Sequence, residues 1–105
     1  MPYEIKFADY VRSHFEALTA REHATLLDAI EKKLTHEPLV ETRNRKPLRP
    51  NPVAPWELRV GPLRAFYEVA PRDPESETST AVVRILAAGK KERNILRIAG
   101  EEITL

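Results

Sequence analysis

Residues 56–69 have the sequence WELRVGPLRAFYEV, in which apolar side chains alternate with mainly charged ones on both sides of a Gly-Pro pair. A period of two residues is typical of a half-buried strand, and a central turn signal joins two such strands into a β-hairpin. A turn at Gly61-Pro62 places Leu58 opposite Ala65. One face of the hairpin is therefore apolar, and we expect it to form part of a core.

The other face of this hairpin carries two arginines. The same pairing places Arg59 opposite Arg64, and like charges in directly opposite positions destabilise a sheet. In a purely structural interpretation, Glu57 on the same face neutralises one arginine in a surface ion pair. In a functional interpretation, the two guanidinium groups bind a phosphate or a carboxylate, which their planar donor forks suit. A basic turn expected over residues 89–93 would add to such an anion site.

The residues before the hairpin predict a strand and two helices. Residues 3–7 alternate as a strand does, and from Asp9 the apolar residues follow a helical period. Residues 19–22 match a capping box, which begins a second helix. This helix must end near His36, because Pro38 disfavours the helical conformation in the residue before it. Two helices joined by one cap predict an αα-hairpin.

The remaining segments predict further strands and their connections. Residues 38–55 contain five prolines and are interpreted as an irregular connection. Residues 71–80 hold no large apolar side chain, which predicts a surface loop. Residues 81–88 are almost continuously apolar and suit a central strand covered on both faces. Residues 95–105 form a final extended piece, which is broken at Gly100. Helices followed by a run of strands indicate an α+β fold.

We therefore expect a single domain over residues 1–105. Its sheet should have three or four strands, be mostly antiparallel, carry both helices on one face and leave the other face open. The chain has no cysteine and no apolar run near the roughly 20 residues that span a membrane. We expect a cytoplasmic protein without a membrane segment. The three histidines lack the spacing of metal ligands, so we expect neither a metal site nor a cofactor.

Basic charge is concentrated in two blocks of the chain. Residues 43–64 carry six basic and one acidic side chains, a net charge of +5. Residues 81–105 carry five basic and three acidic side chains, a net charge of +2, while the whole chain has +1. If the fold brings these blocks together, they form the basic patch of an anion binder. If it does not, they are two solvated faces.

Three stretches, in this order, resemble the RelE/ParE superfamily of toxins from type II toxin–antitoxin systems. They are the basic segment 45–49 (RKPLR), the hairpin 56–69 and the strand and turn 85–94 (ILAAGKKERN). The resemblance implies a RelE-like fold and a toxin that its tightly bound cognate antitoxin neutralises. In the RelE branch it implies an endoribonuclease that cleaves mRNA on the ribosome without a metal and so inhibits translation.

The resemblance also implies roles for particular residues. Arg64 matches the arginine that stabilises the reacting phosphate, Arg59 a strand lysine and Lys91 an arginine of the turn. Arg97 falls near an expected catalytic tyrosine, whereas Glu57 stands where active members often carry a second lysine. The catalytic set expected from this resemblance is Arg59, Arg64, Lys91 and Arg97. The RNA-binding set expected from the two basic blocks is Arg45, Lys46, Arg49, Lys90 and Arg93.

Two alternatives to the ribonuclease stay open at this point. Members of the ParE branch keep the same fold and inhibit DNA gyrase. A catalytically inactive member would instead bind its antitoxin and act as a co-repressor. The residue departures at positions 57 and 97, and an apparent terminal strand over residues 103–105, leave both alternatives in play.

Overall fold

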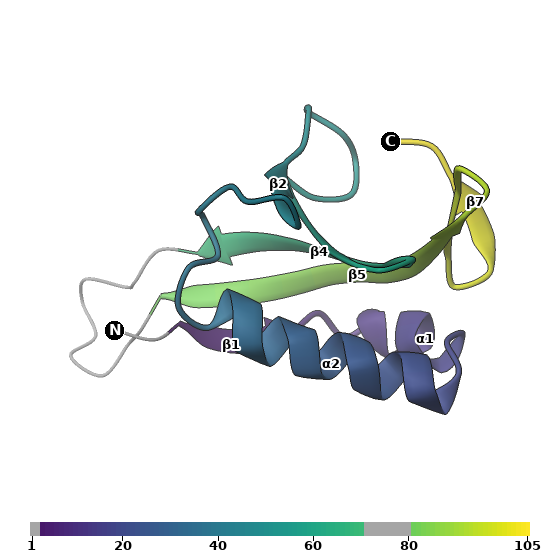
Figure 1. Ribbon diagram of the computed structural model, residues 1–105, viewed down its shortest axis with the longest axis horizontal. Helices are drawn as coiled ribbons and strands as arrows, with labels where there is room; N and C mark the ends of the chain where they lie inside the picture. Colours follow the sequence, from purple (N-terminus) through teal and green to yellow (C-terminus); the bar gives the residue numbers. More distant parts are fainter. Residues whose placement is uncertain (1–2, 71–80) are drawn as a thin grey trace.

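The computed structural model describes residues 3–70 and 81–105, so the surface loop expected over residues 71–80 lies outside the described residues. Helices lie on one side of a curved sheet (Figure 1). In chain order the elements are β1 (Glu4–Phe7), α1 (Val11–Glu16), α2 (Ala20–Leu34), β2 (Arg45–Pro47), β3 (Trp56–Val60), β4 (Leu63–Ala70), β5 (Val82–Glu92), β6 (Ile95–Ile98) and β7 (Glu101–Ile103).

The described strands form one sheet in the order β2-β3-β4-β5-β6-β7, and β1 pairs in parallel with β5. The α+β class and the antiparallel order of the main sheet are as expected, but the expectation of three or four strands was wrong. Two features account for the larger number of strands, and the second follows from the break expected at Gly100. Residues 45–47 pair with β3 within the proline-rich connection, and residues 95–103 turn back at Ala99-Gly100, where φ is +53° and +82°.

The hairpin of β3 and β4 has the register that its sequence predicts. Leu58 pairs with Ala65, Arg59 pairs with Arg64, and Gly61 takes the positive φ of +59° that the turn requires. The apolar face of the hairpin packs under the helices. The two arginines consequently lie on the opposite side of the sheet.

The second helix begins at the predicted capping box. The Thr19 amide donates to Glu22 Oε1 at 3.0 Å, and the Glu22 amide donates to Thr19 Oγ1 at 3.1 Å. The helix ends at Leu34, before Pro38. Two backbone donors of the first turn are thereby satisfied, which fixes where the helix starts relative to the sheet.

The main core lies between the helices and the sheet. Its fully buried side chains include Leu26 and Ile30 of α2 and Leu58 and Tyr67 of the hairpin. The Tyr67 hydroxyl donates to the Pro38 carbonyl at 2.6 Å, and burial raises the pKa of this phenol. This bond ties the chain that follows α2 to the sheet.

The expectation that the other face of the sheet is open was wrong. A second buried cluster covers part of it, formed by Ala54, Phe66, Ala87, Leu96 and Ile98. The segment between β2 and β3 and the β6–β7 hairpin both rise on this side and flank the curved surface (Figure 1). The proline-rich segment between β2 and β3 contributes apolar side chains to this cluster without forming a helix or strand. Its sequence therefore has no periodicity that could predict the second core.

The strand expected over residues 81–88 is longer than predicted. It continues to Glu92, so the basic turn expected over residues 89–93 was wrong and the turn lies at Arg93-Asn94, with φ of +52° and +66°. Gly89 permits this extension, because a Cβ there would lie 2.4 Å from the Arg97 carbonyl oxygen of β6. The pairing with β4 also shifts by one residue at Phe66/Tyr67.

One side chain completes the pairing of β5. Its first residues pair with β1 and its last four with β6, and between them the Ala88 amide donates to His14 Nδ1 of α1 at 3.2 Å. An acceptor at Nδ1 requires the neutral imidazole. Burial lowers the pKa of His14, which favours the same neutral form.

We predict that Leu58→Ala lowers the free energy of unfolding by about 2–5 kcal/mol, because it opens a cavity in the main core. Urea unfolding followed by the fluorescence of Trp56 measures the change. Leu39→Ala is the matched control, since Leu39 is 51% exposed and its loss should cost less than about 0.5 kcal/mol. Equal effects of the two variants would contradict the assigned core.

We predict that His14 makes stability fall as the pH drops below about 6.5, the ordinary pKa of histidine in an unfolded chain. The unfolded chain then binds a proton that the folded chain, with its lowered His14 pKa, does not. Urea unfolding of the wild type and of His14→Gln between neutral pH and mild acid tests this. The difference between the two proteins should shrink as the pH falls, because His23 and His36 remain in both; a constant difference would refute it.

Candidate functional site

Charged side chains gather on the face of the sheet opposite to the helices. Strand β3 contributes Glu57 and Arg59, β4 contributes Arg64, and β5 contributes Lys91. Lys91 pairs with Leu96, a member of the second core, and therefore belongs to this face. The structure thus brings together three of the four expected catalytic residues around one carboxylate.

Glu57 is the carboxylate at the centre of this group. Its side chain is only 8% exposed and accepts a hydrogen bond from Arg59 Nε at 2.6 Å. The Arg59 side chain keeps 43% of its surface exposed. The structural interpretation therefore holds for Arg59, whose charge Glu57 neutralises. A planar guanidinium with one edge held in this way can still offer its other donors to an anion.

Arg64 is held differently from Arg59. Its Nη1 donates to the carbonyls of Gly61 at 2.6 Å and Leu63 at 2.9 Å, and within the described residues it forms no ion pair. Burial lowers the pKa of Arg64, Glu57 opposes this effect and the charge of Arg59 adds to it. A guanidinium nevertheless stays protonated near neutral pH. Arg64 is therefore a positioned, partly desolvated cation.

Lys91 shares a cavity with Glu57. This cavity, of about 250 Å³, lies between β3 and the last two strands, and Glu102 also lines it. The Lys91 amide donates to the Pro62 carbonyl at 2.7 Å, so the end of β5 is fastened to the hairpin turn. The lysine side chain is exposed, and it lies on the same face of the sheet as the two arginines.

Two more expected RNA-binding residues border this face. Lys46 of β2 pairs in register with Glu57, which places it on the same side of the sheet. Arg49 is exposed in the segment after β2 and lines a cavity with Glu68. Together with Lys91, they place positive charge on both sides of the arginine pair.

Arg45 has a different environment, on the helix side of the sheet. Its Nη1 donates to the Lys33 carbonyl at 2.7 Å, and its Nη2 lies 3.8 Å from Glu37 Oε2. The side chain is 13% exposed. Arg45 therefore satisfies a carbonyl of the last turn of α2, where a cation also complements the helix dipole.

The other expected residues also lie away from the charged face. Lys90 points to the helix side and pairs with Glu22 at 2.5 Å and Glu92 at 3.6 Å, contacts that raise its pKa. Arg97 pairs in register with Lys90 and lines a small cavity with His14 on that same side. Arg93 is exposed at the tip of the β5–β6 turn.

Sequence reasoning missed several features around the site. No local sequence signal announces the second core, which lies on the same face as the arginines. The same holds for the cavity that Glu102 lines and for the hydrogen bond of His14 to β5. Among residues 3–70 and 81–105, no group of three or more possible ligands is placed to hold a metal ion. Over the same residues, no helix is both long and apolar enough to cross a bilayer.

We predict that Arg59→Ala destabilises the protein by about 1–3 kcal/mol, because it leaves the Glu57 carboxylate buried without its partner. Arg64→Ala should cost less than about 1 kcal/mol, since its removal leaves no buried charge unpaired. The double variant Glu57→Gln/Arg59→Ala should regain part of the loss. Urea unfolding of the wild type, of the single variants Glu57→Gln, Arg59→Ala and Arg64→Ala, and of the double variant measures these differences, and an additive double variant would contradict the coupling.

Comparisons with known proteins find a solved structure that is similar to most of this chain. No family model matches it, and no curated protein matches it significantly. Among solved structures, it is similar to a chain in the crystal structure of the toxin–antitoxin complex RelBE2 from Mycobacterium tuberculosis, with a TM-score of 0.66 and 27% identity. The match covers 87% of this chain and 93% of that chain. By structural similarity, the chain therefore resembles a RelE-like toxin of a toxin–antitoxin system.

Proposed function

We propose that the protein is the toxin of a type II toxin–antitoxin system and that it cleaves mRNA on the ribosome without a metal ion. The observation that carries this proposal is the arrangement of Arg59, Arg64 and Lys91 on one face, with Arg64 partly desolvated and forming no ion pair within the described residues. A cation held in this state by carbonyls interacts more strongly with an anion than a solvated one does.

The proposed reaction needs no cofactor. The 2′-hydroxyl of one nucleotide gives up its proton to water and attacks the adjacent phosphate in line, so that an O2′–P bond forms and a 2′,3′-cyclic phosphate results. The P–O5′ bond breaks, and the leaving 5′ oxygen takes up a proton from water. Negative charge grows on the phosphate oxygens, where Arg64 donates. Lys91 supplies a second cation on the same face. In the absence of RNA, Glu57 holds Arg59 close to Arg64, so the donors are placed before the substrate arrives.

Basic residues beyond this group would bind the RNA backbone. Lys46 and Arg49 continue the charge toward β2, and Arg93 stands at the tip of the β5–β6 turn. Arg45 and Lys90 already have protein partners on the helix side. We assign the phosphate contacts to Lys46 and Arg49, because they border the face that carries Arg59 and Arg64, and charge on one continuous face is what an RNA strand can follow.

A cognate antitoxin is the protein partner in this proposal. The similar solved structure is a toxin–antitoxin complex, and a toxin of this kind must be held inactive until its partner is removed. An antitoxin that covers the charged face would present acidic groups to it. Its expression together with the chain should therefore prevent any effect on growth.

We predict that induced expression of the chain without an antitoxin arrests growth and cuts transcripts within coding regions. Arg64→Ala should lower the rate of transcript cleavage by at least about a hundredfold and prevent growth arrest. Removing one positioned donor to a developing negative charge lowers a reaction rate by about this factor. Growth and mRNA integrity are followed together over the first minutes. Thermal unfolding of the purified Arg64→Ala protein verifies that the fold is intact.

Arg12→Ala is the matched control, since Arg12 is an exposed arginine of α1 on the far side of the sheet. It should leave arrest unchanged. Arg97→Ala should behave like this control because Arg97 lies on the helix side, and a loss of activity there would restore the role expected from the sequence. Arrest with intact transcripts would refute the ribonuclease in favour of a gyrase inhibitor, and unimpaired growth would favour an inactive co-repressor.

A further inference from the structure

A cavity of about 430 Å³ lies on the charged face of the sheet, at the end of β4 that is far from the hairpin turn. Its walls include apolar side chains of the β2–β3 segment and of β5, among them Leu48, Val53 and Leu86. The charged residues that line it are Arg49 and Glu68. An apolar cavity with a few polar groups is the usual form of a site for a small planar ligand.

The β2–β3 segment is a preformed wall of this cavity, because its own hydrogen bonds hold its shape. The Leu48 amide donates to the Pro55 carbonyl at 2.8 Å and closes the segment into a loop. Inside the loop, Asn51 Oδ1 accepts from the amides of Val53 and Ala54 at 2.8 and 3.1 Å. Asn51 Nδ2 donates to two backbone carbonyls of the same segment, at 2.7 and 2.9 Å. The Asn51 carboxamide is thereby fully used within the loop, and recognition of a ligand falls to other groups.

The irregularity of β5 supplies a second apolar wall. Leu86 is the extra residue between Ala87, which pairs with Phe66, and Ile85, which pairs with Tyr67. The Leu86 side chain is half-buried, packs against the second core and lines the cavity. A bulge changes the direction of a side chain in this way next to many functional sites.

Glu68 presents the unpaired polar group of the cavity. Strand β4 alternates without interruption, so Glu68 shares its face with Phe66 of the second core and with Arg64. Arg84 of β5 lies opposite Glu68 in the register, but within the described residues the Glu68 side chain forms no ion pair. A carboxylate only accepts hydrogen bonds. The cavity therefore selects a ligand that brings N–H or O–H donors.

Guanine is the RNA base whose donors suit a carboxylate best. It carries two neighbouring N–H groups, at N1 and N2 of its Watson–Crick edge, and a carboxylate can accept both at once. Adenine and cytosine place a ring-nitrogen acceptor beside their amino group, and uracil has one N–H between two carbonyls. In those bases an acceptor would face the carboxylate without a hydrogen bond. The exposed Arg49 suits the phosphate of such a nucleotide and repels a cationic ligand.

We propose that this cavity binds a guanine base of the RNA, with Glu68 accepting from N1 and N2 and Arg49 contacting a neighbouring phosphate. The inference rests on the proposed function, which places RNA along this face. Glu68 follows Arg64 by four residues on β4, so their Cα atoms are about 13 Å apart. The bound base is therefore a few nucleotides from the phosphate at Arg64. Glu68 determines specificity and touches no reacting atom.

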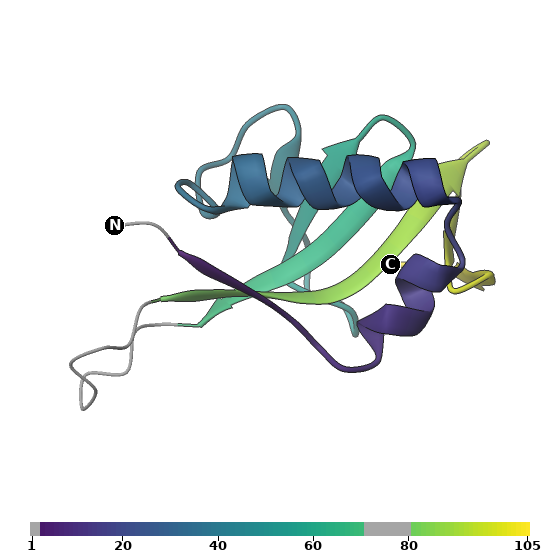
Figure 2. The same ribbon diagram turned by 90° about the horizontal axis from the view of Figure 1, so that it is seen from below.

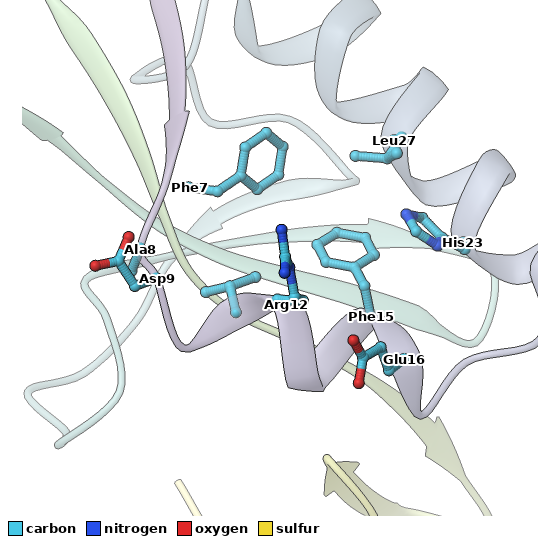
Figure 3. Close-up of a pocket in the computed structure, with 9 residues that line it drawn as sticks. Phe7, Ala8, Asp9, Arg12, Phe15, Glu16, His23 and Leu27 are labelled. Carbon is cyan, nitrogen blue, oxygen red and sulfur yellow. The ribbon is translucent and has the colours of Figure 1, made fainter.

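The helix side of the sheet offers a larger hollow, of about 840 Å³, and a matched control. Figure 2 views the molecule from this side, with α1 and α2 across the sheet. Figure 3 shows the hollow, with the rings of Phe7 and Phe15 and the carboxylate of Glu16 at its border. RNA that contacts Arg64 runs along the opposite side of the sheet. Removing the exposed charge of Glu16 should therefore leave base preference unchanged.

Binding of short single-stranded RNA tests the inference. The probes are a labelled oligouridylate and three copies of it with a central guanine, adenine or cytosine, all with 2′-O-methyl riboses that prevent cleavage. Fluorescence anisotropy at one fixed salt concentration measures Kd for each probe. The wild type should bind the guanine probe at least about tenfold more tightly than the adenine probe, because a bidentate pair discriminates between bases by about this factor.

Glu68→Gln should reduce this preference to less than about twofold, because a carboxamide replaces one of the two acceptors by a donor. The ratio of two Kd values is the readout, since removing a negative charge strengthens the binding of every RNA. Glu16→Gln removes the same charge on the helix side and should keep the tenfold ratio. Circular dichroism verifies that both variants fold.

Three results would overturn the inference: equal affinities of the wild type for the four probes, binding of none of them, or a guanine preference that survives in Glu68→Gln. Arg64→Ala should retain the preference, because Arg64 is assigned to a phosphate and not to the base. The ribonuclease is tested separately by the fate of transcripts in cells. Intact transcripts there would refute cleavage, while a guanine preference that depends on Glu68 would still support this base site.

Discussion

Along one of its edges, strand β5 forms backbone hydrogen bonds with three different neighbours, and the rest of the structure depends on these bonds. Its other edge pairs with β4 along most of its length. On the shared edge, β1 occupies the beginning, His14 of α1 accepts from Ala88, and β6 occupies the end. Buried amides must be paired, so the positions of β1, α1 and β6 are fixed by the backbone of one strand.

The register shift in the same strand decides which lysine belongs to the charged face. Phe66 pairs with Ala87 but Tyr67 pairs with Ile85, so one residue of β5 is extra and the alternation reverses beyond it. Lys91 consequently faces the arginines, and Lys90 faces Glu22 on the helix side. With uninterrupted alternation, these two lysines would exchange places. A single backbone irregularity thus sets the composition of the candidate site.

The features that the sequence predicted are local, and those that it missed are not. The hairpin register, including the opposed arginines, follows from alternation around Gly61, and the start of α2 follows from the capping box. The register shift, the second core and the side of the sheet that Arg97 occupies depend on contacts between distant segments. A two-residue period can say which residues share a face of one strand, but not how a bulge reverses that face.

Glu57 explains why the sheet can hold two arginines opposite each other. Its buried carboxylate binds Arg59, which lowers the repulsion on Arg64 without filling the donors that Arg64 presents. A lysine at this position would add a further cation to the arginine pair and leave the repulsion between the two arginines uncompensated. With glutamate, the free chain keeps its cations together at the cost of some positive potential. Two like charges directly opposite each other on a sheet are unfavourable, and here the neighbouring Glu57 compensates them. Such a compensated departure from the local rules of sheet stability is expected at a functional site.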